Sequence, residues 1–218
     1  MAFLPLFPLN TVLFPGMQIQ LHIFEERYKL MVNKCIENNE PFGVVLIRRG
    51  REALGPVATP YPVGCTAAIS EVQQLPLGRM NITAVGQRRF RIKRIDRNQP
   101  FLRADVEFFM PADDQPELVH RYSRLLRPLV IHYLETLSSS EDAKFDREQI
   151  PHRPRSIAQI ASILLQADSA QKQQLLATPS LSRLMRTLVE IYRLETLLLR
   201  VRLSPPDKEF NIGPFSSN

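Results

Sequence analysis

Hydrophobic positions in the first half of the chain recur with the spacing of β-strands. Polar and apolar residues alternate over 18–21, 62–75 and 80–85, while 42–47 is a continuous apolar run rich in β-branched residues. Alternation predicts strands with one buried face, and the continuous run predicts a strand covered on both faces. A last strand is predicted over 101–110.

Prolines constrain the beginning of the chain. Pro5, Pro8 and Pro15 fix φ and remove backbone donors, so they exclude a helix and favour short strands at a sheet edge. Pro15-Gly16 predicts a turn. The period then changes to that of a helix, which we expect to end at 38–41. Its predicted buried face consists of Tyr28, Met31, Val32, Cys35 and Ile36.

Glycines and a Pro-Leu-Gly-Arg turn punctuate the later strands. Gly64 predicts a bulge or bend, 76–79 predicts a hairpin turn, and Gly86 predicts a strand break where a barrel has to bend. Beyond it, apolar Phe90 and Ile92 share one face of a strand. Many short strands with one early helix favour a closed or nearly closed barrel, which removes exposed edges.

Helical periodicity replaces strand periodicity after residue 112. We therefore expect an α+β chain with a β-barrel domain over 1–112, a helical domain over 113–203 and a disordered tail over 204–218. A capping box at Asp114 opens the first helix, with a kink at Pro128, and 138–155 reads as a long loop. The apolar stripe of this first helix consists of Leu118, Tyr122, Leu125, Leu126, Leu129, Tyr133, Leu134 and Leu137.

Three more helices are predicted after that loop. The first opens at Ser156, with Ile157, Ile160, Ala161 and Leu164 inward. The second is capped by Asp168 or Ser169. The last runs from about Ser180 to Leu203, and its apolar residues fit either packing within its own bundle or a partner-binding stripe. These residues are Leu181, Leu184, Leu188, Ile191, Leu194, Leu198 and Val201.

Composition narrows the possible functions. The net charge is +6, and 88–97 alone carries six cations and one anion, so the excess positive charge comes mainly from one segment. The two cysteines, Cys35 and Cys65, belong to no Cys-x-x-Cys pair and read as buried reduced thiols. The histidines show no metal-ligand spacing, and the beginning of the chain is a poor signal peptide. We expect a cytoplasmic protein without cofactor, metal or membrane segment.

The opening sequence resembles the amino-terminal substrate-binding domain of Lon proteases. The resemblance rests on LPLFPLNTVLFPG (4–16) and LHIFEERYKLMV (21–32), and it continues through FGVVLI, VGCTAAI and LPLGRMNITAVGQRRFRI. It extends into the helical part at 156–195. It implies a PUA-like β pseudobarrel followed by a small C-terminal helical bundle. The family usually has an acidic residue in the hairpin where this chain has Leu77.

The catalytic parts of a complete Lon enzyme have no counterpart in this sequence. Gly50 and Gly55 have the spacing of a phosphate-binding loop, but Pro56 and Val57 follow in place of Lys and Ser or Thr. No Gly-x-Ser-x-Gly motif is present, and no room is left for a protease domain. The resemblance therefore implies a stand-alone, non-catalytic module that binds unfolded or extended polypeptide. A hand-off of that polypeptide to a separate protease is a further expectation.

Two candidate binding surfaces follow from these patterns. For polypeptide binding, we expect Phe14, Met17, Phe24 and Glu26 near the barrel mouth. The run 24–28 also fits a purely structural role, with Phe24 and Tyr28 in the core and Glu25 and Arg27 bonded locally. The alternative function is RNA binding by the basic segment 88–97, which fits an exposed strand face equally well. Its candidate residues are Arg88, Arg89, Arg91 and Lys93.

Overall fold

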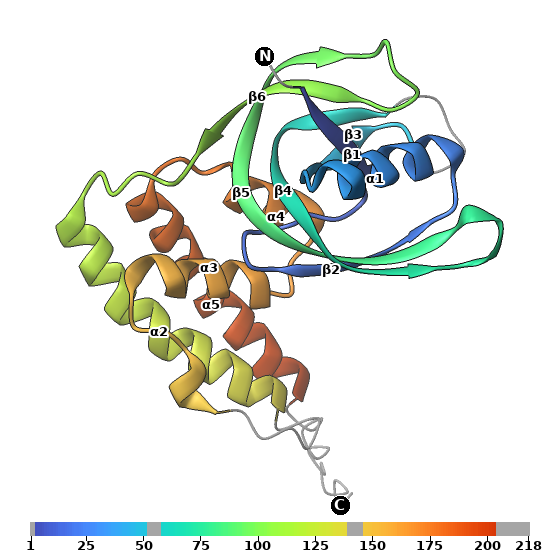
Figure 1. The fold of residues 1–218 in the computed structure, drawn as a ribbon. Coiled ribbons are helices and arrows are strands. Elements are labelled where there is room, and N and C mark those ends of the chain that lie inside the picture. Colours follow the sequence, from blue (N-terminus) through green and yellow to red (C-terminus); the bar gives the residue numbers. More distant parts are fainter. Residues whose placement is uncertain (1–2, 52–57, 139–145, 204–218) are drawn as a thin grey trace, which may run out of the picture.

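The computed structural model describes residues 3–51, 58–138 and 146–203. A ring-like sheet occupies one part of the molecule and a group of helices the other (Figure 1). The expected tail at 204–218 and the middle of the expected 138–155 loop lie outside the described residues. The predicted α+β class, with a β pseudobarrel preceding the helices, is confirmed.

Five strands close into a ring and a sixth pairs outside it. β5 pairs with both β4 and β6, and β1 joins β3 to β6, which completes the circle β5–β4–β3–β1–β6. β2 pairs only with the first half of β5. The strands are β1 (Leu4–Leu9), β2 (Gln18–Ile23), β3 (Phe42–Arg49), β4 (Thr59–Gln74), β5 (Met80–Asp96) and β6 (Arg103–Phe109).

The proline-rich strand β1 is short, as predicted, but it is not an edge strand. Residues 6–9 pair in parallel with β3, and Leu4 and Pro5 pair with β6. Each neighbour uses only part of β1, so a strand with few backbone donors still has partners on both sides. The Leu6 N–H, for example, donates to the Leu102 carbonyl at 2.8 Å.

Gly86 does not break β5, so the predicted strand break is wrong. The strand runs through it, and Gly86 does not have a positive φ. A Cβ there would lie only 2.1 Å from the Phe14 carbonyl oxygen. Glycine is therefore required by the close approach of another backbone segment. Gly64 meets the same constraint, since its Cβ would lie 2.4 Å from the Val44 carbonyl oxygen. The bulge predicted at Gly64 is also present, because the β3–β4 register shifts between Gly64 and Pro60 of β4.

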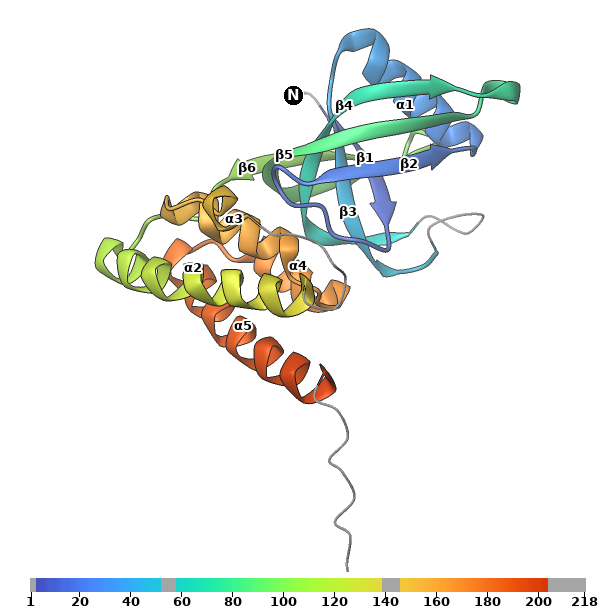
Figure 2. The same cartoon turned by 90° about the horizontal axis from the view of Figure 1, so that it is seen from below.

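Helix α1 (Glu26–Asn38) covers one opening of the ring (Figures 1 and 2). Tyr28, Met31, Val32 and Cys35 are buried as predicted, whereas Ile36 is exposed. The Tyr28 ring stacks on Phe7 of β1, with 4.1 Å between ring centroids. Lys29 donates to the Leu77 carbonyl at 2.8 Å, so α1 also holds the β4–β5 hairpin turn.

The helices pack around two long members, α2 (Pro116–Ser138) and α5 (Leu181–Leu203). The segments preceding these helices meet at a parallel bridge between Ala112 and Ser180. Tyr133 and Tyr192 then meet edge to face between the two helices, 5.0 Å apart. A short 3-10 turn η2 (Arg147–Gln149), α3 (Pro154–Leu164) and α4 (Ser169–Ala177) complete this part.

Several helical predictions need correction. α2 continues to Ser138 and α3 begins at Pro154, so the expected loop is shorter at both ends. The buried face of α2 is shifted from the predicted stripe, because Val119 and Val130 are buried and Leu125 is exposed. α3 is preceded by Arg153 and starts with Pro154, not at a Ser156 cap. The Asp168 cap of α4 is confirmed, with its carboxylate accepting from the Gln171 N–H at 2.7 Å.

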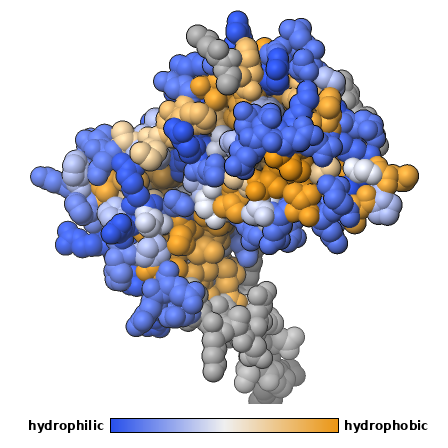
Figure 3. Space-filling model, in the orientation of Figure 1, coloured by the Kyte–Doolittle hydropathy of each residue, from blue (hydrophilic) through white to orange (hydrophobic). Residues whose placement is uncertain are grey.

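The far end of α5 also departs from its prediction. Leu194, Leu197 and Leu198 are exposed, whereas Leu184 and Leu188 are buried. One face of the helix stays packed as far as Thr196, which is buried, whereas these three leucines lie on a face that is left uncovered. Apolar residues gather on the lower part of the helical region in Figure 3.

One hydrophobic cluster spans the junction between the ring and the helices. Val12, Phe14, Leu46 and Val63 come from the ring part and pack with buried residues of α2, α3, α4 and α5. Gln173 of α4 donates to the Val63 carbonyl at 2.9 Å across the same junction. The two parts therefore share a core, and the boundary between residues 112 and 113 stays a prediction.

Candidate functional site

The structure separates the four residues expected at a barrel mouth. Phe14 is 1% exposed in the junction core, and Met17 is half-buried beside it. Phe24 is 44% exposed and Glu26 is exposed, at the opposite end of β2. At roughly 3.3 Å per residue, β2 places Met17 and Phe24 about 23 Å apart. These four side chains do not form one surface.

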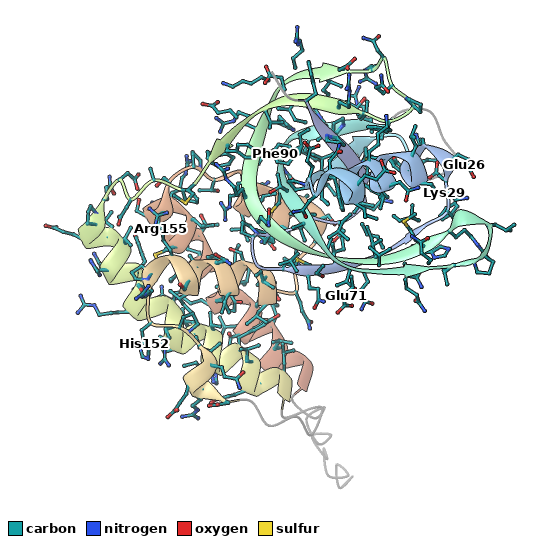
Figure 4. All side chains as sticks on the ribbon, viewed as in Figure 1. Glu26, Lys29, Glu71, Phe90, His152 and Arg155 are labelled. Atoms are coloured by element: carbon teal, nitrogen blue, oxygen red, sulfur yellow. The ribbon has the colours of Figure 1, made fainter. Side chains whose placement is uncertain are left out.

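The run 24–28 agrees with the structural interpretation except at Phe24, and its role in binding stays a prediction. Tyr28 is buried, and Arg27 bonds Glu25 at 2.8 Å, as the structural interpretation predicts. Phe24 is not a core residue, because its ring is exposed and stacks on His22. Glu26 pairs with Lys29 on α1, far from Arg155 in Figure 4.

A groove of about 260 Å³ runs beside β2 and includes Phe24. In the described part of the chain, β2 pairs on one side only, with β5. Apolar side chains gather over the space between α1 and β2 (Figure 3). A free strand edge next to apolar side chains can accept an extended peptide as an added strand. Its lining residues are Phe7, Leu9, Gln20, Leu21, His22, Ile23, Phe24, Glu25 and Tyr28.

A second pocket, of about 470 Å³, opens where the ring meets the helices. β6 and the residues after it form one side, and α3 and the start of α5 form another. We call it the junction pocket. Apolar groups make most of its wall, and its charged lining residues are all arginines. It is lined by Pro15, Gln87, Arg88, Arg89, Phe108, Phe109, Met110, Pro111, Arg155, Ala158, Gln159, Leu181 and Leu184.

Arg89 connects this pocket to the helical part. Its side chain is buried, with 6% of the residue exposed. One guanidinium nitrogen, Nη1, donates to the carbonyl oxygens of Leu175, Leu176 and Thr178 at the end of α4, at 3.5, 3.2 and 3.5 Å. The carboxyl end of a helix carries partial negative charge, so it suits a cation. Burial nevertheless lowers the pKa of Arg89 to about 10.

Three other cations of the basic segment lie at the surface and contact side chains of β6. The Arg88 guanidinium lies 4.1 Å from the centroid of Phe108, and that of Arg91 lies 5.2 Å from the centroid of Phe109. Lys93 pairs with Glu107 at 2.5 Å. Arg89 is buried, so the four residues do not present a common basic face. RNA binding by this segment stays a prediction.

Arg155 enters the pocket from α3, on the side facing β6 (Figure 4). It donates to the Pro111 carbonyl at 2.6 Å, and its side chain is otherwise exposed. A guanidinium has five N–H donors, so this contact leaves donors for a ligand. At the pocket mouth, Phe108 is 41% exposed and Met110 is 74% exposed.

The thiols are poorly suited to nucleophilic chemistry. Burial raises the pKa of Cys35 to about 11 and that of Cys65 to about 12, so both are protonated near neutral pH. Within residues 3–51, 58–138 and 146–203, no group of three or more His, Cys, Asp or Glu residues has the geometry of a metal site. No helix in these ranges is long and apolar enough to cross a membrane.

Comparison with known proteins assigns the family. The model of the ATP-dependent protease La (LON) substrate-binding domain matches residues 3–193. The chain belongs to this family. A curated Lon protease of Anaeromyxobacter dehalogenans is 22% identical over 92% of the chain, and Lon protease 2 of Myxococcus xanthus is 22% identical over 91%. In both cases the match covers 24% of the relative, so the chain spans about a quarter of its length.

Solved structures of the family share the fold. The Lon N-terminal domain protein from Xanthomonas campestris is 25% identical with a TM-score of 0.60, covering 87% of this chain and 98% of that one. The N-terminal domain of the Mycobacterium avium complex Lon protease is 17% identical with a TM-score of 0.69, covering 88% and 98%. The resemblance expected from the opening sequence is confirmed over nearly the whole chain.

The junction pocket escaped the sequence analysis. Its walls come from β5, β6, α3 and α5, whose meeting is not encoded in any local pattern. Alternation places Arg89, Arg91 and Lys93 on one strand face, and only the docking of α4 distinguishes Arg89 from the others. Phe108 and Met110 lie two positions apart, as residues on one face of a strand do. This spacing was the one local sequence signal of the junction pocket.

Proposed function

We propose that this chain is a non-catalytic module that binds unfolded or extended polypeptide in the junction pocket. The carrying observation is a pocket of about 470 Å³ with apolar walls and exposed Phe108 and Met110 at its mouth. Exposed apolar groups beside a preformed pocket suit the side chains that an unfolded chain displays. The family of substrate-binding domains supports this choice.

Residues 3–193, which match the substrate-binding domain, would do the binding without chemistry of their own. The solved Xanthomonas campestris domain protein, 98% of which is covered by the match, supports this extent. Polypeptide held by the module would then be passed to a separate protease. Two reduced, buried cysteines are consistent with a cytoplasmic location.

The groove beside β2 is the second place where polypeptide would bind. It is smaller, at about 260 Å³, and it includes Phe24. An extended segment added to the β2 edge would gain backbone hydrogen bonds, while its apolar side chains would contact the groove. The junction pocket is the primary proposal because it combines a larger volume with uncovered apolar side chains.

Fluorescence anisotropy tests this proposal. A permanently unfolded model protein, reduced and carboxymethylated α-lactalbumin, is labelled and titrated with this chain, with native α-lactalbumin as the folded comparison. We expect binding of the unfolded form at tens of micromolar or tighter. Replacing Phe108 and Met110 with Ser should weaken it at least fivefold, because both contact groups are lost without disturbing the core.

Leu77→Ser is the matched control variant. Leu77 is 85% exposed at the hairpin turn, so this substitution removes a similar apolar group at a distance from the pocket. Equal weakening by both variants would show nonspecific apolar adsorption, and no binding at all would remove the proposal. A labelled single-stranded RNA is titrated in parallel at low and physiological salt. RNA binding that falls with salt and requires Arg88 would favour the alternative function.

A further inference from the structure

Arg89 is a buried cation without a carboxylate partner. Only 6% of the residue is exposed, and no Asp or Glu in the described part of the chain forms an ion pair with it. Buried charges in proteins are usually paired, because desolvation of an isolated ion is costly. The carbonyl oxygens at the end of α4 offset only part of that cost, as they carry partial charge.

The surroundings of Arg89 reinforce this imbalance. Arg88 and Arg155 line the same junction pocket, and among the residues that the structure describes no acidic one lines it. Arg88 stacks on Phe108 and Arg155 donates to Pro111, so each is positioned by a single contact that leaves N–H donors for a ligand. Arginine donors in such number suit an oxyanion, especially a carboxylate that accepts two parallel hydrogen bonds.

The apolar walls of the pocket indicate which kind of carboxylate ligand would fit it. Half-buried Pro15, Phe109 and Pro111 present apolar surface to the same space as the arginines. Ala158, Leu181 and Leu184 also line it but are almost completely buried. The last residue of a polypeptide carries an apolar side chain and a carboxylate on one Cα, so it can fill the apolar wall and meet a guanidinium together. An internal Asp or Glu has the carboxylate in place of the apolar group and cannot do both. The buried Arg89 marks the inner end of the pocket, and the exposed Met110 marks its mouth.

We infer that the junction pocket recognises the free C-terminal carboxylate of a polypeptide that ends in an apolar residue. The terminal carboxylate binds Arg89, Arg88 and Arg155, and the terminal side chain packs on the apolar wall of the pocket. The preceding residues leave the pocket over Phe108 and Met110. This inference rests on the proposed function and specifies which part of a polypeptide enters the site.

Three labelled peptides of identical length test it by anisotropy. The first ends in Leu-Phe-Leu with a free carboxylate. The second is the same peptide with a C-terminal amide, and the third is the amide with a Glu three positions from its end. The free acid should bind at least tenfold more tightly than either amide, and the advantage should shrink with added salt because the contact is ionic.

Protein variants locate the effect. Arg155→Gln should reduce the ratio of acid to amide affinity at least threefold. Arg121→Gln, an equal loss of charge on the exposed face of α2 outside the pocket, should leave the ratio unchanged. Arg89→Gln should abolish the ratio, but it also removes the contacts to α4. Arg155→Gln and the peptide amides therefore decide the result even if the Arg89→Gln variant unfolds.

Each contrary outcome has a distinct meaning. Equal affinity for acid and amide would overturn carboxylate recognition while leaving polypeptide binding intact. Equal affinity for the acid and the internal Glu peptide would overturn the assignment to the chain terminus. Failure of all three peptides, together with failure of unfolded α-lactalbumin, would remove both this inference and the proposed function.

Discussion

Replacing Gly86 with Ala should destabilise the ring far more than a typical surface change. The new Cβ would lie 2.1 Å from the Phe14 carbonyl oxygen and 3.0 Å from its carbonyl carbon. Both are backbone atoms, so relief requires moving the segment that carries Phe14. That segment is held by two hydrogen bonds of 2.8 Å, from the Gly16 N–H to the Gly86 carbonyl and from the Gly86 N–H to the Met17 carbonyl.

The expected cost follows from these contacts. Overpacking costs about 1–3 kcal/mol, and weakening two backbone hydrogen bonds adds roughly 1 kcal/mol each. The sum, about 3–5 kcal/mol, is a large part of the 5–15 kcal/mol that typically stabilises a protein. Gly78→Ala is the control. Gly78 has a φ of +67°, but its Cβ would meet nothing closer than 3.9 Å, so only backbone strain of about 1–2 kcal/mol applies.

Urea denaturation followed by far-UV circular dichroism measures the difference, since the chain has no Trp for fluorescence. The Gly86→Ala midpoint should fall well below that of Gly78→Ala with little change in slope. Equal, small losses in the two variants would refute the close approach of the Phe14 segment to β5.

Three further changes probe other parts of the fold. Phe90→Ala should cost about 3–5 kcal/mol in urea denaturation, because the ring is fully buried against Gly43 and Gly64; an unchanged midpoint would place the ring at the surface. Leu77→Asn should stabilise the hairpin by about 0.5–1 kcal/mol, because Leu77 has a φ of +64° that Asn tolerates better; a lower midpoint would contradict this. The raised pKa values of Cys35 and Cys65 mean that the folded state keeps protons that the unfolded state loses above about pH 9. Their contribution is therefore fully present below about pH 9 and declines as pH rises from about 9 through about 11 for Cys35 and about 12 for Cys65. The variant with both cysteines replaced by Ala should show a flatter decline; an identical decline would rule the thiols out as its cause.

Local patterns predicted the elements whose burial is decided by near neighbours. Alternation located β4 and β5, helical spacing located α1, and the side chain of Asp168 marked the start of α4. In each case the sequence signal and the structural cause involve residues within a few positions of each other.

Long-range packing decided what the patterns missed. Gly86 reads locally as a strand breaker, but its role is set by Phe14, 72 positions earlier. Arg89 reads as part of an exposed basic face until α4, more than 80 residues later, covers it. Leu194 fits the apolar stripe of α5, yet it is exposed while Tyr192 and Thr196 on either side of it are buried, so the packed face of the helix is set by its neighbours. The junction pocket depends on contacts between distant segments, so no single stretch of the sequence predicts it.

Site-specific photocrosslinking tests the location of polypeptide binding most directly. Benzoylphenylalanine is placed at Phe108, at Phe24 or at Leu77, three exposed apolar positions at the junction pocket, the β2 groove and the hairpin turn. Each protein is irradiated with unfolded α-lactalbumin. We expect strong crosslinks from position 108, weaker ones from position 24 and none above background from position 77. Equal yields at all three positions, or none from position 108, would contradict binding in the junction pocket.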